Sequence, residues 1–315
     1  MSLVHGPHRS IPTTSAQERF LAELFDTLWD RYRRRVSYVQ MYESVVLGAG
    51  ATFVNDHIAF RTFACQQPMS GIATLSRVFD VLGYRAAGCY HFADKNLSAI
   101  HFQHPNGQLP KIFISELKVW ELPAETRDTI LRTVASHRLP ISETRLAELA
   151  ACDNLDAGQW SQLLERVIHE FHDLPWNLPE KHDVAAVNQV SQYAAWVLVH
   201  GYNVNHFTSL INSHGVESLE DIEKTIAALH RVGVPMKAEI EGARGSKLRQ
   251  TATQAVLIDV DVIDGGQQAK LPWTYAYFEL AERGDVTNHE TGERGRFEGF
   301  LGPQATNLFE MTKKK

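Results

Sequence analysis

The sequence lacks the features by which several large protein classes are recognised. Its 315 residues contain three cysteines, Cys65, Cys89 and Cys152, which lie far apart and form no CxxC pair. This spacing argues against a zinc ribbon and a secreted disulfide framework, and it favours a reducing compartment. There is no apolar run of membrane-spanning length and no signal-peptide pattern. We therefore expect a cytoplasmic protein with no membrane partner.

An excess of positive charge is also missing. Lys and Arg number 31 against 37 Asp and Glu, a formal net charge of −6, which provides no electrostatic surface for nucleic acid. The motifs GxGxxG, GxxxxGK[ST], GxSxG and HExxH are absent, which argues against dinucleotide, P-loop, hydrolase and zincin sites. The composition that remains, 44% hydrophobic and 22% charged, is typical of a folded globular protein.

The first part of the chain predicts the element order β-α-β-β-β. Thr14 or Ser15 can cap a first helix, and a second short helix precedes Gly48. β-Branched and aromatic residues then predict a strand over Phe53 to Phe63. It is followed by a helix over 74–82, a strand over 84–88 and a hairpin of 97–104 and 111–117.

The second part repeats this order after a helical insert. Helices are predicted over 125–137, 142–151, 157–172 and 184–199, the last behind a possible Asp183 cap. Next come a strand over 204–211, a helix over 218–232, a short strand near 237–240, and strands over 248–261 and 273–281. Two such units can form a cupped sheet around one pocket. We predict an α+β fold and one compact unit with four regions: N-terminal helices (1–50), a first module (51–122), the insert (123–200), and a second module with the C-terminal segment (201–315).

Two residues of the first predicted strand are candidates for chemistry. Because side chains alternate along a strand, His57 and Arg61 share one face. Their Cα atoms would be about 13 Å apart, so a metal ligand and a guanidinium could hold opposite ends of a small acid. The alternative is structural: a core histidine with a hydrogen bond, and an arginine paired with a nearby carboxylate.

A second imidazole and a carboxylate come from the other module. His206 lies in its opening strand, and Glu279 lies in an otherwise apolar and aromatic last strand, where burial of a carboxylate would be costly without a cation. Two histidines and one carboxylate around one pocket would form the facial triad that suits non-heme Fe(II). The alternative is an ion pair between Glu279 and Arg283.

Other candidates are weaker. His101 and His104 flank a turn and are expected at the surface, and the HEFH sequence at 169–172 lacks zincin spacing. Glu116 ends the last strand of the first module, in the place symmetrical with Glu279, and could be a fourth ligand or support the other three. The polar stretches 245–253 and 299–307 could supply substrate contacts, or could simply form a strand edge and a helix start.

Five segments together resemble a known family. They are 55–63 (NDHIAFRTF), 113–117 (FISEL), 200–208 (HGYNVNHFT), 277–283 (YFELAER) and the stretch from GFLG at 299–302 to FEMT at 309–312. In this order they are similar to the 2-oxoadipate dioxygenase/decarboxylase (hydroxyglutarate synthase) family of the vicinal-oxygen-chelate, glyoxalase-like superfamily. The likeness runs from about residue 15 to residue 312 and is to the family's shorter branch, so part of the substrate pocket is expected to differ.

The resemblance implies a function and a set of roles. It implies βαβββ modules, Fe(II) held by His57, His206 and Glu279, and Arg61 as the catalytic residue that receives a substrate carboxylate. The implied reaction converts 2-oxoadipate and O2 into 2-hydroxyglutarate and CO2, as in lysine catabolism. Two alternatives stay open: a glyoxalase-like isomerase or lyase using Zn, Ni or Mn, and a non-catalytic small-molecule binding protein. The sequence does not indicate an oligomeric state.

Overall fold

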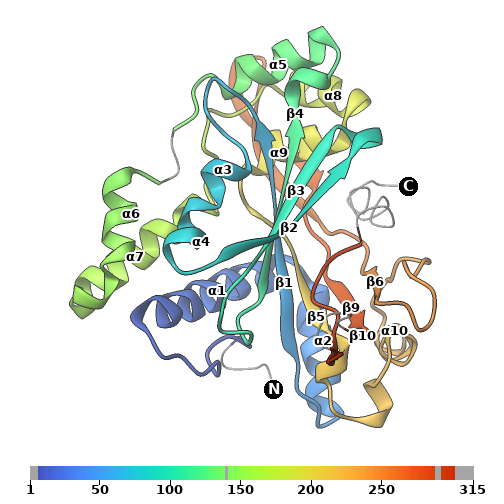
Figure 1. Ribbon diagram of the computed structural model, residues 1–315. Coiled ribbons are helices and arrows are strands. Elements are labelled where there is room, and N and C mark those ends of the chain that lie inside the picture. Colours follow the sequence, from blue (N-terminus) through green and yellow to red (C-terminus); the bar gives the residue numbers. More distant parts are fainter. Residues whose placement is uncertain (1–5, 139–140, 288–291, 302–315) are drawn as a thin grey trace.

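The computed structural model describes residues 6–138, 141–287 and 292–301. Its largest sheet contains β1 (Val54–Ala64), β2 (Arg85–Phe92), β3 (Leu97–Gln103), β4 (Lys111–Lys118), β5 (Val204–Leu210), β6 (Leu248–Ala252) and β9 (Glu279–Arg283). The spatial order is β2-β3-β4-β1-β5-β9-β6, and the sheet is curled (Figure 1). The α+β class predicted from the sequence is confirmed.

Two halves of the sheet meet at its centre. The first half is β2-β3-β4-β1, and the second is β5-β9-β6. Each begins with a strand that pairs in parallel with the last strand of its own half, β1 with β4 and β5 with β9. β1 and β5 pair with each other in antiparallel orientation and so join the halves into one surface. The first strands of both halves therefore lie side by side.

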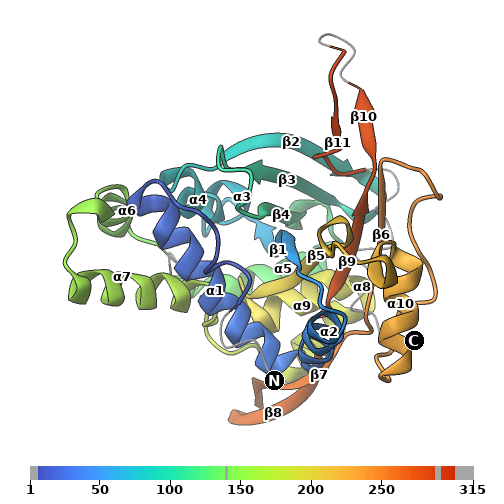
Figure 2. The ribbon, with the colours of Figure 1, turned by 90° about the horizontal axis from the view of Figure 1, so that it is seen from below.

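The remaining elements cover or extend this sheet. The helices are α1 (Ala16–Arg35), α2 (Ser37–Gly48), α3 (Ile72–Leu75), α4 (Arg77–Val81), α5 (Ala124–Val134), α6 (Glu143–Ala150), α7 (Ala157–Glu170), α8 (Lys181–Val190), α9 (Gln192–His200) and α10 (Ile222–Arg231). Two separate hairpins are β7 (Leu257–Asp264) with β8 (Gln267–Thr274), and β10 (Asp285–Thr287) with β11 (Arg294–Arg296). Figure 2 shows α6 and α7 at one side and β10 and β11 projecting at the other. No helix in the described part of the chain is long and apolar enough to cross a membrane.

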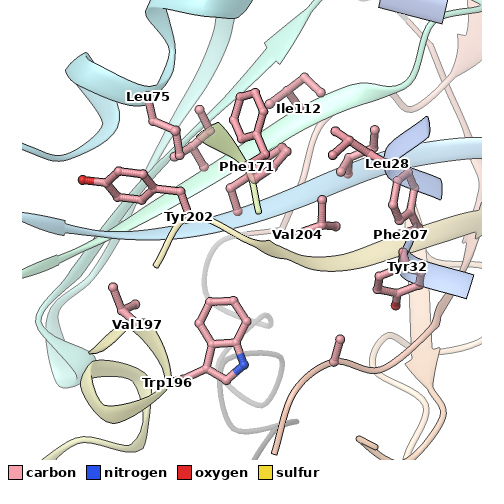
Figure 3. Close-up of a cluster of buried hydrophobic side chains, with 14 of the residues drawn as sticks. Leu28, Tyr32, Leu75, Ile112, Phe171, Trp196, Val197, Tyr202, Val204 and Phe207 are labelled. Carbon is pink, nitrogen blue, oxygen red and sulfur yellow. The ribbon is translucent and has the colours of Figure 1, made fainter. Parts of the chain in front are cut away.

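The hydrophobic core lies between α1 and the central strands. Ser15 caps α1: its side chain accepts a hydrogen bond from the Glu18 backbone N–H. Ser15 is one of the two residues, Thr14 and Ser15, that the sequence offered as this cap. The apolar face of the helix packs on β5. The ring of Tyr32 lies 5.0 Å from that of Phe207 (Figure 3), and the ring of Trp29 lies 5.1 Å from that of Phe207. Side chains on the opposite face of the central strands are left to line a cavity.

The last helix of the insert is shorter than predicted. One helix was expected over 184–199, but Ser191 is extended, with φ −146°, and it separates α8 from α9. Its hydroxyl accepts a hydrogen bond from Ala194 N–H, which starts a new helix there. Asp183 is not a cap: it lies inside α8 and accepts two hydrogen bonds from Arg132. Eight of the nine residues of α9 are buried, so this helix forms part of the wall beneath the sheet.

The second half departs from the predicted order. The strand expected over 248–261 is divided into β6 and β7, and the strand expected over 273–281 into β8 and β9. Between them the backbone of Val256 bonds to Ala276, so the chain leaves the main sheet and forms the β7–β8 hairpin. The segment near 237–240 is not a strand and pairs only through bridges at Met236 and Glu241. The apolar pattern continues through these breaks, which explains the error.

One buried histidine makes stability depend on pH. Burial lowers the pKa of His200 to about 3, and its Nε2 lies 2.9 Å from the Thr274 carbonyl oxygen. Its neutral form stabilises the fold above its unfolded-state pKa of about 6.5, and this contribution is lost as the pH falls. We expect the unfolding free energy of His200→Gln to drop by about 2 kcal/mol less than that of the wild type between pH 7.5 and pH 5.0.

Urea unfolding at the two pH values measures this difference. The control is His182→Gln, whose side chain is 78% exposed and which should retain the wild-type pH dependence. Equal pH dependence in all three proteins would contradict the assignment of His200 as a buried neutral group.

Candidate metal centre

Three side chains from distant parts of the chain meet in the cavity. His57 comes from β1, His206 from β5 and Glu279 from the first position of β9. Each offers one ligand atom, and these atoms all lie within 4.8 Å of one another. Within residues 6–138, 141–287 and 292–301, this is the group of His, Cys, Asp or Glu side chains close enough to hold one ion. The structure thus brings together the three residues singled out in the sequence.

The separations between these atoms suit one cation. His57 Nε2 lies 3.3 Å from His206 Nε2 and 3.3 Å from Glu279 Oε1, and His206 Nε2 lies 3.5 Å from Glu279 Oε2. Ligands about 2.1 Å from a shared ion, at angles near those of an octahedron or tetrahedron, are separated by roughly 3.0–3.4 Å. The side chains therefore need little rearrangement to bind a metal.

Glu279 carries a buried oxygen that lacks a partner. The carboxylate is 0% exposed, and its Oε1 accepts hydrogen bonds from Gln250 Nε2 at 2.7 Å and Thr208 Oγ1 at 3.3 Å. Its Oε2 has no hydrogen-bond partner among the described residues. An unpaired buried carboxylate oxygen is costly unless a cation offsets it. The donor set of two imidazoles and one carboxylate fits a divalent transition metal.

Two single-residue register shifts orient the histidines. Along the β1–β5 pair, Asn55 lies opposite Ser209 and His57 opposite Thr208, so Asp56 is an extra residue on β1. Ala59 lies opposite His206 and Phe60 opposite Val204, so Asn205 is an extra residue on β5. Bulges of this kind bend a strand and redirect side chains. Each histidine thus follows a residue that does not take part in regular alternation.

The extra residues bind the histidine ring nitrogens that face away from the centre. His57 Nδ1 lies 2.8 Å from Asp56 Oδ2, and His206 Nδ1 lies 3.0 Å from Asn205 Oδ1. Carboxylate and amide oxygens accept hydrogen bonds, so each Nδ1 carries the proton and each Nε2 keeps its lone pair. Such partners fix the ring and the tautomer of metal-binding histidines. Both rings are therefore held ready to coordinate through Nε2.

Arg283 holds Asp56 in place. Its Nε and Nη2 donate to the two carboxylate oxygens of Asp56 at 2.6 and 2.7 Å, and both side chains are buried. The sequence left open an ion pair between Glu279 and Arg283. In the structure Arg283 instead forms a bidentate pair with Asp56. Burial alone would raise the pKa of Asp56, but Arg283 and His57 outweigh it and hold the pKa well below its usual range. Asp56 remains a carboxylate.

The two histidines differ electrostatically. Burial favours neutral His57, but its hydrogen bonds and charge interactions with Asp56 and Glu279 outweigh burial and raise its pKa. Burial, assisted by the nearby His57 and Arg61, holds the pKa of His206 well below its ordinary value. The surroundings of His57 attract positive charge, and His206 is neutral. A neutral imidazole is the form that binds a metal.

Arg61 lines the same cavity at a distance from the triad. Its guanidinium lies over the rings of Tyr193 and Trp196, at 5.0 and 5.3 Å from their centroids. Burial lowers its pKa, but a guanidinium stays charged at neutral pH. Ala59, Phe113, Ser115 and Tyr277 also line this cavity. A cation and a metal-binding triad thus share one cavity.

Glu116 does not join this group. Its Oε2 accepts a hydrogen bond from the backbone N–H of Ile72, at the start of α3. The symmetry argument that selected it is corrected by the strand register: Thr208 pairs with Glu279, and the corresponding residue of β1, Ala59, pairs with Phe113. The residue symmetrical with Glu279 is therefore Phe113.

The other histidine candidates also lie elsewhere. His101 was expected at the surface but is 2% exposed. Its Nδ1 forms a hydrogen bond with Oη of Tyr90, a residue that lines the cavity. His169 is half exposed on α7 beside Asp173, and it does not belong to the ligand group found in the described residues. Of the polar stretches, Gln250 and Phe300 line the cavity, while 302–307 lie outside the described residues.

Sequence reasoning missed the residues that support the triad. They are Asp56, Asn205, Thr208, Gln250 and Arg283. One signal was available for two of them: each candidate histidine directly follows a residue with a side-chain oxygen, in Asp56-His57 and Asn205-His206. An alternating strand pattern places such neighbours on opposite faces, so only the bulges bring them into contact.

Comparison with known proteins identifies the family. The model of the family described as 2-oxoadipate dioxygenase/decarboxylase matches residues 27–310. The chain belongs to this family. It is therefore an enzyme of a group of decarboxylating dioxygenases, as the resemblance implied.

Individual relatives agree with this membership. A protein from Oryza sativa named 2-oxoadipate dioxygenase/decarboxylase, chloroplastic/amyloplastic, is 29% identical over 277 residues, covering 82% of this chain and 68% of that protein. The structure of the hydroxyglutarate synthase from Oryza sativa in complex with 2-oxoadipate matches with a TM-score of 0.75 and 25% identity, covering 96% of this chain and 94% of that one. A glyoxalase superfamily protein from Ralstonia eutropha has the same fold, with a TM-score of 0.80 at 20% identity, covering 95% and 92%.

The support that Asp56 gives His57 can be tested. We expect Asp56→Asn to weaken the binding of a divalent metal, with Fe(II) as the probe, by about 10- to 100-fold, because the amide loses the charge that orients the ring and favours its binding to a cation. Equilibrium competition with a chromogenic chelator measures the dissociation constant. Asp259→Asn, at an exposed position of β7, is the control and should bind like the wild type. Unchanged affinity in Asp56→Asn, with a normal melting temperature, would remove Asp56 from the site.

Proposed function

We propose that this protein is an Fe(II)-dependent dioxygenase that decarboxylates a 2-oxo acid, with 2-oxoadipate as the leading substrate. The observation that carries the proposal is the convergence of His57, His206 and Glu279 at one buried point. Membership of the family supports the reaction class, and the Oryza sativa structure named for its complex with 2-oxoadipate supports the substrate. The choice of iron rests on the donor set, which is that of non-heme Fe(II) oxygenases.

The proposed reaction balances without a second organic substrate. 2-Oxoadipate and O2 give 2-hydroxyglutarate and CO2. The bond between the first two carbons breaks, the first carbon leaves as CO2, and the keto carbon becomes a carboxylate. One oxygen atom of O2 enters this carboxylate and the other becomes the hydroxyl group. Bound Fe(II) would supply the redox chemistry that activates O2.

The chain's own residues would bind and orient the acid. His57, His206 and Glu279 would hold the metal on one side and leave positions for the 1-carboxylate and the 2-keto oxygen. Arg61, whose guanidinium lies over the rings of Tyr193 and Trp196, would receive the far carboxylate through a bidentate contact. Aromatic residues around the cavity would exclude water from the reacting end.

The compartment stays a prediction. The sequence favours the cytoplasm, whereas the name of the Oryza sativa relative places that protein in plastids.

The triad predicts a common loss of metal and activity. His57→Ala, His206→Ala and Glu279→Gln should each reduce bound Fe(II) to background and abolish O2 uptake, because two remaining ligands hold iron poorly. Metal analysis after anaerobic reconstitution and an oxygen electrode with 2-oxoadipate measure both effects. His169→Ala, which replaces a half-exposed histidine of α7, is the control. Full iron content and rate in Glu279→Gln would refute the site.

Oxygen consumption also separates this function from an isomerase. Turnover of 2-oxo acids without uptake of O2, in protein that retains its metal, would instead support the glyoxalase-like reaction. Binding without any turnover would support the binding protein.

Arg61 predicts a different kinetic effect. Arg61→Lys should raise KM by roughly 10- to 100-fold, because one charge-assisted hydrogen bond of the planar fork is lost. Iron content should not change, and kcat should change less than KM. Steady-state O2 uptake measures these constants. Arg35→Lys is the matched control, because Arg35 also lies over a tyrosine ring, at 5.5 Å from Tyr275, but does not line the cavity. An unchanged KM in Arg61→Lys would contradict the role.

A further inference from the structure

The segment after β11 forms one wall of the cavity. Phe300 and Leu301 line it, although both lie far along the chain from His57 and His206. The Phe300 ring meets His57 edge-on, with centroids 4.9 Å apart and planes at 87°. Its centroid also lies 4.9 Å from that of Phe113 and 5.2 Å from that of His101. Phe300 thus covers His57, a proposed metal ligand, on the side of β3 and β4, which carry His101 and Phe113.

Several hydrogen bonds fix the backbone that carries this ring. Arg283 Nη1 donates to the carbonyl oxygens of Phe297 and Gly299 at 3.0 and 2.8 Å. The backbone N–H of Phe300 donates to Tyr90 Oη at 3.0 Å. Lys111 forms an ion pair with Glu298. Because Arg283 also holds Asp56, one guanidinium links the orientation of His57 to the position of this wall.

The free space left by this wall is small. The cavity volume is about 40 Å³. An acid in this cavity lies against Phe300 and Leu301, and the tethered backbone limits how far these side chains can move aside.

From this geometry we infer that Phe300 determines specificity by limiting the width of the acid at the carbons next to its keto group. The inference rests on the proposed function for the position of the acid, with its keto end at the triad and its far carboxylate at Arg61. An unbranched 2-oxo dicarboxylate lies along the side of the Phe300 ring that faces the cavity. A methyl branch on carbon 3 meets the Phe300 ring and is excluded. The same ring shields the triad from solvent.

The test compares binding of two acids by Fe(II)-loaded protein under anaerobic conditions. The acids are 2-oxoadipate and its 3-methyl derivative, titrated by calorimetry into the wild type, Phe300→Ala, Phe300→Leu and Phe297→Ala. In the wild type the branched acid should bind at least about tenfold more weakly than the unbranched one. Phe300→Ala should remove most of this discrimination, and Phe300→Leu should give an intermediate value.

Phe297→Ala is the matched control. It lies on the same segment, but its ring packs beside Lys247 and does not line the cavity. It should retain the wild-type discrimination. If Phe300→Ala discriminates as strongly as the wild type, the inference is overturned.

A second measurement does not depend on the acid. The rate at which a chromogenic chelator removes Fe(II) should be several-fold higher in Phe300→Ala than in the wild type and Phe297→Ala, because the cover over His57 is gone. An unchanged rate would refute the shielding. If the wild type binds neither acid, the proposed substrate class fails, and the width limit fails with it. Faster release of Fe(II) from Phe300→Ala would still assign the ring to the metal centre.

Discussion

The burial of the Glu279 carboxylate is the constraint on which the site depends. The side chain is 0% exposed, and one of its oxygens has no hydrogen-bond donor among the described residues. In a protein interior an ionised carboxylate without compensation costs several kcal/mol. Gln250 and Thr208 donate hydrogen bonds to Oε1, and two imidazole nitrogens lie 3.3 and 3.5 Å from the carboxylate, where they can bind a cation together with it. The free-energy cost of burial falls on this one carboxylate, and the polar residues of the site lie around it.

The same constraint explains the two bulges. A histidine that must coordinate through Nε2 needs an acceptor for the proton on Nδ1, and no acceptor is available across a regular strand because neighbouring side chains diverge. Asp56 and Asn205 each occupy an extra position, and each reaches the ring that follows it. The acceptors differ in charge: Asp56 is a carboxylate neutralised by Arg283, whereas Asn205 is neutral. This difference raises the pKa of His57, while that of His206 is held low by burial.

Much of the framework could be predicted from local patterns, and less of the site. β1, β3, β4 and β5 follow from their hydrophobic alternation and turn signals, and α1 follows from its cap and apolar face. The split of 184–199 at Ser191 and the departure of the β7–β8 hairpin depend on tertiary pairing, because the local pattern runs through both breaks. His57, His206 and Glu279 stand out as polar residues within apolar strands. Asp56 and Arg283 form a pair across 227 residues, which no local pattern can reveal.

The antiparallel contact of β1 with β5 relates the two halves by an approximate dyad. Under this dyad His57 corresponds to His206, and Glu279 corresponds to Phe113. A strictly duplicated chain would surround the centre with four ligands and leave little room for a reactant. Here the aromatic ring of Phe113 takes the place of the second acid. The centre is therefore polar on the side of Glu279 and apolar on the side of Phe113. Because the two halves differ at this position, the centre has three ligands in place of four and leaves room for a reactant on the apolar side.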